Sequence, residues 1–267
     1  MKIRLLSSII GFPIALFIVI YGDLLLLTSI SIIAFIGLVE IFRAFNVKSM
    51  SVKVIGYFTH FIYFIILAYN QNTYMTYLIS FYLLCLLILF VLQYPKFEIN
   101  TILYVFFSFF YVSFLFSHIY LVRNIPEYGI WLVWLIFISA WGSDTFAYAT
   151  GLTIGKNLLA PELSPKKTKE GAIGGVVGAT LLACIFGYFF TVINDLNSVY
   201  IVLFAIVAGI ASILSQIGDL AASAIKRKVQ IKDFGNLIPG HGGILDRFDS
   251  IIFTAPFVYY VVTIFIN

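Results

Sequence analysis

The sequence predicts an all-α polytopic integral membrane protein with about nine transmembrane helices. Hydrophobic residues make up 62% of the 267 residues and charged residues only 10%, whereas soluble domains carry about 25% charged residues. Apolar runs of about 20 residues recur along the chain, and each is long enough to cross a bilayer as a helix. These two observations exclude an ordinary soluble domain.

Each predicted span is an apolar run bounded by polar residues. The first run follows two basic residues, as in a signal peptide. It is long, however, and no cleavage site of small residues follows it, so we expect a retained helix. The nine predicted spans are residues 5–22, 24–45, 54–69, 73–93, 99–121, 130–150, 172–192, 198–222 and 250–266.

The distribution of Lys and Arg predicts how the chain crosses the membrane. With nine spans, 15 of the 16 basic residues fall on one face and only Arg123 falls on the other; without the span 54–69 they would divide 6 against 10. Because basic residues concentrate in cytoplasmic loops, we expect a cytoplasmic N-terminus and an extracytoplasmic C-terminus. The expected location is the cell inner (cytoplasmic) membrane.

Half of the charged residues lie in two short segments. Of the 28 charged residues, six fall between Lys156 and Glu170 and eight between Lys226 and Asp249. In the nine-span arrangement both segments face the cytoplasm, so the chemistry of this protein is expected at the cytoplasmic face of the membrane.

This charge pattern suggests a division of the chain into two regions. Residues 1–129 would form an N-terminal membrane region of about five spans. Residues 130–267 would form a C-terminal catalytic region of about four spans, and its cytoplasmic loops would be residues 151–171 and 223–249.

Four carboxylates are expected at the cytoplasmic ends of three helices. Asp144 lies near the inner end of the sixth span and Asp219 near that of the eighth. Asp246 and Asp249 are three residues apart at the start of the ninth span and would project together. Acidic residues in membrane helices are costly and point to function. All four are candidate ligands of Mg²⁺, which proteins bind through one or two carboxylates plus substrate phosphates; a second cation would also fit.

Basic and small residues accompany these acids. On a continuing eighth helix, Asp219, Ser223 and Lys226 share one face, because their spacing is i, i+4, i+7. Lysine and arginine suit phosphate groups, and glycine lets a ligand approach the main chain closely. The pattern indicates phosphoryl or nucleotidyl transfer at a membrane surface. The candidate catalytic residues are Lys226, Asp246 and Asp219, and the candidate substrate-binding residues are Lys166, Lys167, Ser223, Arg227, His241, Gly242, Gly243 and Arg247.

Structural interpretations of these features stay open. The basic loops would also serve as topology determinants and as contacts for anionic lipids. His60 and His118 stand alone in apolar runs and are expected to be satisfied core residues. The small-residue stretch 171–178 allows helices to approach closely, either within one subunit or between the two subunits of a homodimer. Cys85 and Cys184 lie in apolar runs and indicate neither a disulfide framework nor a zinc site.

The second charged segment resembles the signature of a known family. "SAIKRKVQIKDFGNLIPGHGGILDRFD" (Ser223–Asp249) resembles that of the CDP-diacylglycerol synthases, or phosphatidate cytidylyltransferases, through S-x-I-K-R, K-D-x-G, the proline, H-G-G and D-R-x-D. "LSPKKTKEG" (163–171) is similar to the family's S-P-K-K-T-x-E-G stretch, and "WGSDTFAY" to its segment on an earlier helix. The resemblance implies that CTP and phosphatidate react to CDP-diacylglycerol and pyrophosphate in phospholipid biosynthesis, with Mg²⁺ required and no nucleic acid involved.

Two other functions compete with this interpretation. A CTP-dependent polyprenol or dolichol kinase would share some of the loop chemistry, although the complete D-R-x-D ending favours the synthase. An ion or proton transporter would use Asp144 and Asp219, but it would place its acids near mid-bilayer and would not need a glycine-rich basic loop.

Overall fold

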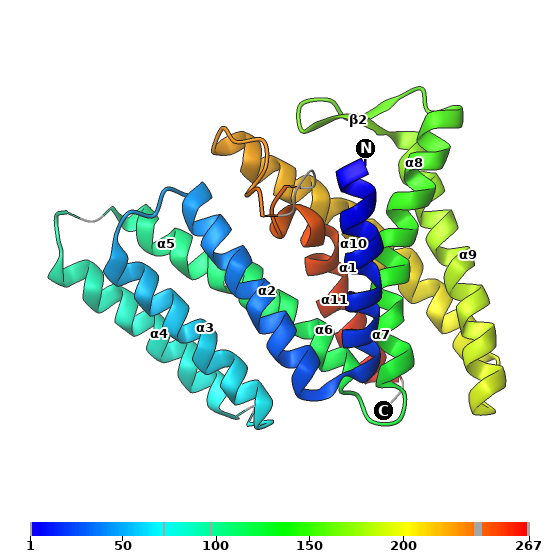
Figure 1. Cartoon of the computed structure of the whole chain (residues 1–267), viewed down its shortest axis with the longest axis horizontal. Helices are drawn as coiled ribbons and strands as arrows, with labels where there is room; N and C mark the ends of the chain where they lie inside the picture. Colours follow the sequence, from blue (N-terminus) through cyan, green and yellow to red (C-terminus); the bar gives the residue numbers. More distant parts are fainter. Residues whose placement is uncertain (1, 72, 97, 238–241, 266–267) are drawn as a thin grey trace. The chain divides into compact units, whose positions relative to one another are not determined.

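The computed structural model describes residues 2–71, 73–96, 98–237 and 242–265, with side chains from residue 11 onward. Apart from one short hairpin, the regular secondary structure of these residues is helical (Figure 1). The elements are α1 (Lys2–Tyr21), α2 (Asp23–Ala44), α3 (Met50–Ala68), α4 (Thr73–Leu92), α5 (Ile99–Ser108), the π-helix η1 (Phe109–Phe114), α6 (Leu115–Arg123), α7 (Gly129–Phe137), the π-helix η2 (Ile138–Gly142), α8 (Ser143–Ile154), β1 (Leu158–Ala160), β2 (Ser164–Thr168), α9 (Lys169–Asn194), α10 (Val199–Lys228) and α11 (Leu245–Phe265).

Eight helices within the described residues are long and apolar enough to cross a membrane. They match the second to the ninth predicted spans, including the short third span, which becomes α3. The first predicted span corresponds to α1, and its part with described side chains, Gly11–Tyr21, is a shorter apolar helix. The prediction of an all-α polytopic membrane protein is confirmed, whereas the orientation of the termini stays a prediction.

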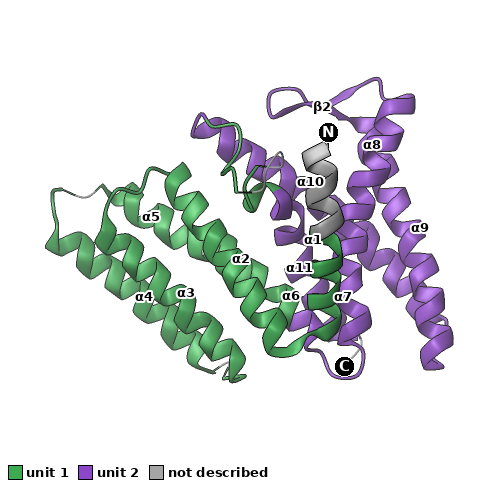
Figure 2. Cartoon of the chain, viewed as in Figure 1, with its two compact units in different colours: residues 1–120, 231–246 green, residues 121–230, 247–267 purple. Residues whose placement is uncertain are grey.

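The chain forms two compact units (Figure 2). Unit 1 comprises residues 1–120 and 231–246, and unit 2 comprises residues 121–230 and 247–267. The division that the sequence predicts, between residues 129 and 130, stays a prediction. By contacts, the segment 231–246 packs with the N-terminal helices, although it follows them by more than a hundred residues.

A buried polar cluster lies in the helical core of unit 1. His60 of α3 is fully buried, and its Nδ1 and Nε2 lie 2.8 Å from Ser113 Oγ and 3.3 Å from Ser31 Oγ. His118 Nδ1 lies 2.9 Å from the carbonyl oxygen of Phe114. Since buried polar groups are costly without a hydrogen-bond partner, these contacts stabilise the core. Both histidines are satisfied core residues, as the sequence analysis expects.

Unit 2 depends on close packing of α9 against α8. A Cβ atom placed on Gly175 would lie 2.8 Å from the carbonyl oxygen of Ser143, and one on Gly178 would lie 2.1 Å from Phe146 Cγ. The small-residue stretch 171–178 is thus occupied by a helix of the same chain. It offers no support for a homodimer, which stays a prediction.

The predicted loop 151–171 contains regular structure. Strands β1 and β2 pair antiparallel, with Leu158 opposite Thr168. Thr168 also caps α9, because its Oγ1 accepts a hydrogen bond of 3.1 Å from the backbone N–H of Gly171. Such a cap satisfies one of the N–H groups that a helix start leaves without an acceptor. The hairpin therefore leads directly into α9.

Replacement of Gly178 by alanine is expected to lower the thermal unfolding midpoint of the protein in detergent. The added Cβ would overlap the ring of Phe146, and overpacking of this kind costs about 1–3 kcal/mol. Gly11→Ala is the matched control, because a Cβ there meets nothing within 4 Å and alanine is the better helix former. Equal midpoints for the two variants would contradict this account of the α8–α9 contact.

Candidate active site

Three acidic side chains of unit 2 form an electrostatic cluster. Asp144 of α8 interacts with Asp219 of α10, and Asp249 of α11 interacts with both. The three residues come from different helices and are separated by up to 105 positions in the sequence. Like charges repel strongly where little water screens them, so the fold has to bring positive groups to this place as well.

Close contacts between helices bring the three acids together. A Cβ on Gly218, the residue before Asp219, would lie 2.6 Å from the carbonyl oxygen of Asp249, so glycine is required where α10 meets α11. Two residues earlier, Gln216 Nε2 donates hydrogen bonds to Ser143 Oγ at 3.3 Å and to the carbonyl oxygen of Ala172 at 3.0 Å. These bonds join α10 to α8 and α9 within one turn of Asp219.

The π-helix η2 immediately precedes Asp144. It covers Ile138–Gly142 and packs against both α9 and α10. Short π-helices within α-helices are rare and are often found at functional sites. Here the π-turn changes the direction in which the following turn of α8 projects its side chains, Asp144 among them.

A basic side chain accompanies each acid of the cluster. Lys167 Nζ forms an ion pair with Asp219 Oδ2. Lys226 interacts electrostatically with Asp249, and Arg247 interacts with Asp144. Lys167 of the first charged segment and Arg247 of the second both interact with Asp144, so charges of both segments gather around the acids of unit 2. Such a mixed cluster can bind an anion through its bases and a cation through its acids.

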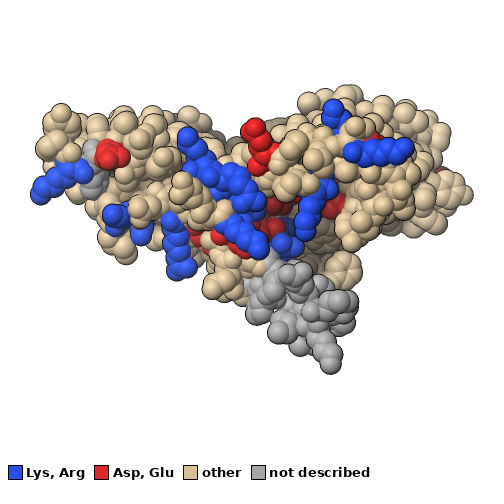
Figure 3. All heavy atoms as spheres, turned by 90° about the horizontal axis from the view of Figure 1, so that it is seen from above, with Lys and Arg blue, Asp and Glu red and all other residues tan. Residues whose placement is uncertain are grey.

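Figure 3 shows the Lys, Arg, Asp and Glu side chains that are visible from one side of the molecule. Lys and Arg side chains, in blue, lie next to Asp and Glu side chains, in red, and the surrounding surface is largely uncharged. A charged group is costly in hydrocarbon and is tolerated where water, an opposite charge or a polar ligand is present. Charged side chains that are exposed in this way therefore have to contact water or a polar ligand.

The hairpin holds Lys167 in position. The carboxylate of Glu170 accepts hydrogen bonds from the backbone N–H of Lys156 at 3.1 Å, from the backbone N–H of Asn157 at 3.1 Å and from Asn157 Nδ2 at 2.7 Å. These bonds fix the start of the hairpin to the first turn of α9. Lys167 lies on β2, one residue before the helix cap Thr168, so its main chain is constrained from both sides.

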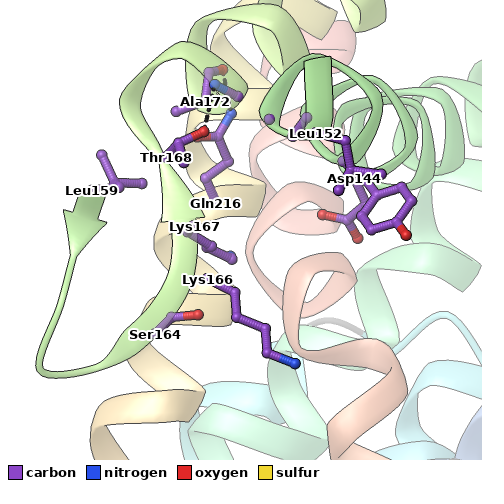
Figure 4. A pocket seen from close by; sticks show the side chains of 13 residues that line it. Asp144, Leu152, Leu159, Ser164, Lys166, Lys167, Thr168, Ala172 and Gln216 are labelled. Atoms are coloured by element: carbon purple, nitrogen blue, oxygen red, sulfur yellow. Dashed lines mark hydrogen bonds between the residues drawn. The ribbon is translucent and has the colours of Figure 1, made fainter. Parts of the chain in front are cut away.

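A pocket of about 540 Å³ lies beside the acidic cluster (Figure 4). Asp144 lies on one side of it, and Lys166 and Lys167 reach it from the hairpin. Most of the other lining residues are apolar or glycine, so the pocket combines charged groups with an apolar wall. Its lining residues are Asp144, Ala147, Tyr148, Gly151, Leu152, Leu159, Ser164, Lys166, Lys167, Thr168, Gly171, Ala172 and Gln216.

The remaining candidates on α10 lie as helical spacing predicts. The helix continues to Lys228, so Asp219, Ser223 and Lys226 do share one face. Ser223 and Lys226 are buried, with 9% of the surface of each residue exposed, whereas Arg227 is exposed. A buried ammonium on this face is suited to a buried phosphate.

The candidates between residues 231 and 246 belong to unit 1. Asp246 Oδ2 accepts hydrogen bonds from the backbone N–H groups of Phe234 at 2.8 Å and Gly243 at 3.0 Å. Gly242 has a φ of +84°, a conformation that other residues rarely adopt. His241 lies outside the described residues. In this structure Asp246 orders the loop, and its role as a metal ligand stays a prediction.

The acids of unit 2 match the donor type that Mg²⁺ prefers. Carboxylate oxygens suit this ion, which usually takes only one or two of them and completes its shell with water and substrate phosphates. Within the described residues, no three His, Cys, Asp or Glu side chains are close enough to hold one metal ion together. The cluster therefore fits an ion that is shared with a phosphate ligand rather than one enclosed by protein alone.

Three contributors to this site are absent from the sequence prediction. Gln216 and Glu170 hold the helices and the hairpin in place, and Tyr148 lines the pocket. The sequence could have indicated Gln216, because a glutamine within an apolar span is costly without hydrogen-bond partners. Glu170 follows a run of basic residues, and its signal was its place in the S-P-K-K-T-x-E-G stretch.

Known proteins resemble this chain over nearly its full length. Residues 2–265 match the cytidylyltransferase family. A phosphatidate cytidylyltransferase of Bacillus subtilis is 34% identical over 99% of this chain and 98% of its own length, and one of Staphylococcus haemolyticus is 36% identical over 96% of each. A phosphatidate cytidylyltransferase of Rickettsia bellii is 47% identical over 49% of this chain and 57% of its own length.

We expect Lys167→Met to loosen the hairpin, because its ion pair with Asp219 ties β2 to α10. Hydrogen exchange of the backbone amides of residues 158–168 should accelerate, and Asp219→Asn should have a similar effect. The double variant should add little beyond either single change. The coupling should be about 1 kcal/mol or less, because the two side chains are 27% and 29% exposed and water screens the pair.

Lys166→Met is the matched control for this experiment. Among the described side chains, Lys166 forms no ion pair, although it lines the same pocket. Lys167 would not have an anchoring role if both lysine variants changed the hydrogen-exchange rate of the hairpin equally. The same would hold if neither variant changed it.

Proposed function

The chain belongs to the cytidylyltransferase family, and on that premise we propose that it transfers the cytidylyl group of CTP to phosphatidate. The products would be CDP-diacylglycerol and pyrophosphate. One structural observation carries the proposal: the ion pair between Lys167 and Asp219 joins the basic hairpin to an acid of the helix α10 beside a pocket. The activity of the relatives supports the choice of substrates.

The proposed reaction is an in-line displacement at phosphorus. A phosphate oxygen of phosphatidate attacks the α-phosphorus of CTP, a new P–O bond forms, and the bond to the oxygen that bridges to the β-phosphorus breaks. The electron pair leaves with pyrophosphate. Such transfers require little covalent participation by protein; they require positioning of the reactants and neutralisation of developing charge.

The pocket is suited to the lipid substrate. Lys166 and Lys167 would hold its phosphate, since an ammonium group is a common phosphate partner. Tyr148, Leu152 and Leu159 form apolar lining on the same pocket and would contact the adjacent acyl chains. Phosphatidate has this combination of a charged head and greasy chains, whereas CTP has no apolar part of that kind.

The nucleotide would use the other bases of the cluster. Lys226 is buried on the same helix face as Asp219 and interacts with Asp249, so its ammonium would lie near reacting phosphates. Arg227, Arg247, Ser223 and the segment with His241, Gly242 and Gly243 are the further candidates. Charge-assisted bonds of this kind are stronger than neutral ones, and they would stabilise the charge that develops on the leaving pyrophosphate.

We include Mg²⁺ in the proposal as the cofactor. Asp219 and Asp246 are the first candidates to hold it, with Asp144 and Asp249 as further ligands or as ligands of a second cation. When bound, such an ion neutralises phosphate charge and lowers the barrier to displacement. The protein side chains would supply the remaining orientation of the substrates.

The proposal also covers the location of the reaction. The protein would lie in the inner (cytoplasmic) membrane with the hairpin and the segment 226–249 facing the cytoplasm, where CTP is available. The distribution of Lys and Arg supports this orientation. A homodimer remains an additional prediction, to be tested by the mass of the protein in detergent.

Purified protein in detergent should release pyrophosphate from CTP only when phosphatidate and Mg²⁺ are present. Asp219→Asn should lower kcat by about 10- to 100-fold or more, because it removes a carboxylate from the charged cluster. Asp195→Asn is the matched control: this aspartate is exposed at the end of α9 with φ of 52°, a conformation that asparagine accepts.

Two further results would argue against the proposed activity, and a third would argue against the proposed metal site. Phosphorylation of a polyprenol with CTP would favour the kinase, and ion flux without turnover would favour the transporter. Normal kcat in Asp219→Asn at saturating Mg²⁺ would remove this residue from the metal site.

A cysteine-labelling experiment tests the orientation. In a chain without Cys85 and Cys184, which are both free thiols, Glu162→Cys at the hairpin tip should resist an impermeant reagent applied to intact cells. Ser198→Cys, at the start of α10, should be labelled from outside. Both residues are exposed, so access to the reagent depends on the side of the membrane. The reverse pattern would place the hairpin outside the cell, away from CTP.

A further inference from the structure

Glu40 in α2 is a buried acid that the proposed chemistry does not use. Only 4% of its surface is exposed. Its Oε1 accepts a hydrogen bond of 2.9 Å from the backbone N–H of Ile244, and its Oε2 accepts one of 3.0 Å from the backbone N–H of Leu245. Both contacts lie within unit 1. One carboxylate therefore binds two consecutive amides more than 200 residues later in the chain.

The two amides are at the start of α11. The first N–H groups of a helix have no acceptor within the helix, and a negative charge near them is favourable because of the helix dipole. In most helices a serine, threonine or aspartate next to the helix start supplies this acceptor. For α11 the acceptor is Glu40 of another helix, so the position where α11 starts depends on α2.

Two glycines of the loop make room for the Glu40 carboxylate. A Cβ on Gly235 would lie 2.4 Å from Glu40 Oε1, and one on Gly243 would lie 2.5 Å from the same atom. Neither distance is compatible with a real side chain, so alanine at either place would displace the carboxylate. This contact explains why glycine is needed at both positions, without any bound ligand.

Asp246 also accepts hydrogen bonds from the backbone of this segment. Its Oδ2 binds the backbone N–H groups of Phe234 and Gly243. Gly243 thus donates its N–H to one carboxylate and packs its Cα against the other. The two acids together hold the backbone at Phe234 and at residues 243–245. A shift of the Glu40 contact would therefore change the orientation of Asp246.

We propose that Glu40 is a positioning residue for nucleotidyl transfer. It acts through the start of α11 and through Asp246, and it does not itself contact the reacting phosphates. The inference rests on the proposed function, in which Asp246 and the H-G-G segment serve the transfer. A misplacement of about 1 Å at a site of this kind can cost about 100-fold in rate.

The first test measures the order of the segment directly. Glu40→Gln keeps the size of the side chain but replaces one acceptor oxygen by an NH₂ group, which cannot accept from a backbone N–H. We expect hydrogen exchange of the amides of residues 243–246 to accelerate about tenfold or more, since a hydrogen bond to a charged group is lost. Glu98→Gln is the matched control, because Glu98 is exposed at the start of α5 and makes no capping bond. Unchanged exchange in Glu40→Gln would overturn the inference.

The second test separates positioning from general stability. Glu40→Ala should lower kcat by about 10- to 100-fold while KM for CTP and for phosphatidate changes little, and Glu40→Gln should retain intermediate turnover. If Glu40→Ala only reduced the amount of folded protein, the intermediate turnover of Glu40→Gln would not be expected. Faster exchange with unchanged kcat, or a rise in KM alone, would contradict a positioning role.

A double-mutant cycle with Gly235 tests the steric part of the argument. Gly235→Ala alone should lower kcat, because its methyl group displaces the Glu40 carboxylate. In the Glu40→Ala background the same change should have little further effect, since the atom that it displaces is gone. Additive losses would mean that Gly235 acts independently of Glu40, which would overturn the steric argument.

The exchange experiment also distinguishes this inference from the proposed function. A wild-type protein without turnover on CTP and phosphatidate would overturn the proposed function. If Glu40→Gln still accelerated exchange at residues 243–246, the ordering of the segment by Glu40 would stand. If the wild-type protein turned over and Glu40→Gln left exchange at residues 243–246 unchanged, the proposed function would stand and the inference about Glu40 would be overturned.

Discussion

Close contact between helix backbones is the constraint on which the candidate site of unit 2 depends. In a bilayer the hydrophobic effect does not drive helices together, so they associate through tight packing and hydrogen bonds. Here α9 meets α8 at Gly175 and Gly178, and α10 meets α11 at Gly218. Gln216 adds hydrogen bonds from α10 to α8 and α9. The three acids of the cluster are neighbours because these backbones are close.

The carboxylates discussed above are stabilised by two different kinds of partner. Asp144, Asp219 and Asp249 interact with basic side chains, which a substrate phosphate or a cation can replace. Glu40 and Asp246 instead accept hydrogen bonds from backbone amides, which no ligand can replace without unfolding the segment. A buried carboxylate is costly without such partners. The first arrangement is suited to chemistry and the second to holding the backbone in place.

The segment 151–171 shows why the sequence prediction was incomplete. A strand of three residues, β1, is too short to produce a detectable alternation of polar and apolar residues. Its pairing partner contains Pro165 and two lysines, which read as a loop. Regular structure forms there because Thr168 caps α9 and Glu170 binds the backbone at Asn157. These contacts are set by the tertiary structure, and they deliver Lys167 to Asp219.

The sequence by itself determined the membrane fold, because apolar runs of about 20 residues have to form helices in a bilayer, where backbone groups find no water. It also determined the chemical character of the candidate site, since charges so rare in this chain are gathered in two segments. Only the tertiary structure decided which of those charges meet. Helical spacing relates residues on one helix, such as Asp219 and Lys226, but it does not relate Lys167 to Asp219 or Glu40 to Leu245. Those pairs depend on how distant segments pack, and packing follows from side-chain shapes that a linear pattern does not contain.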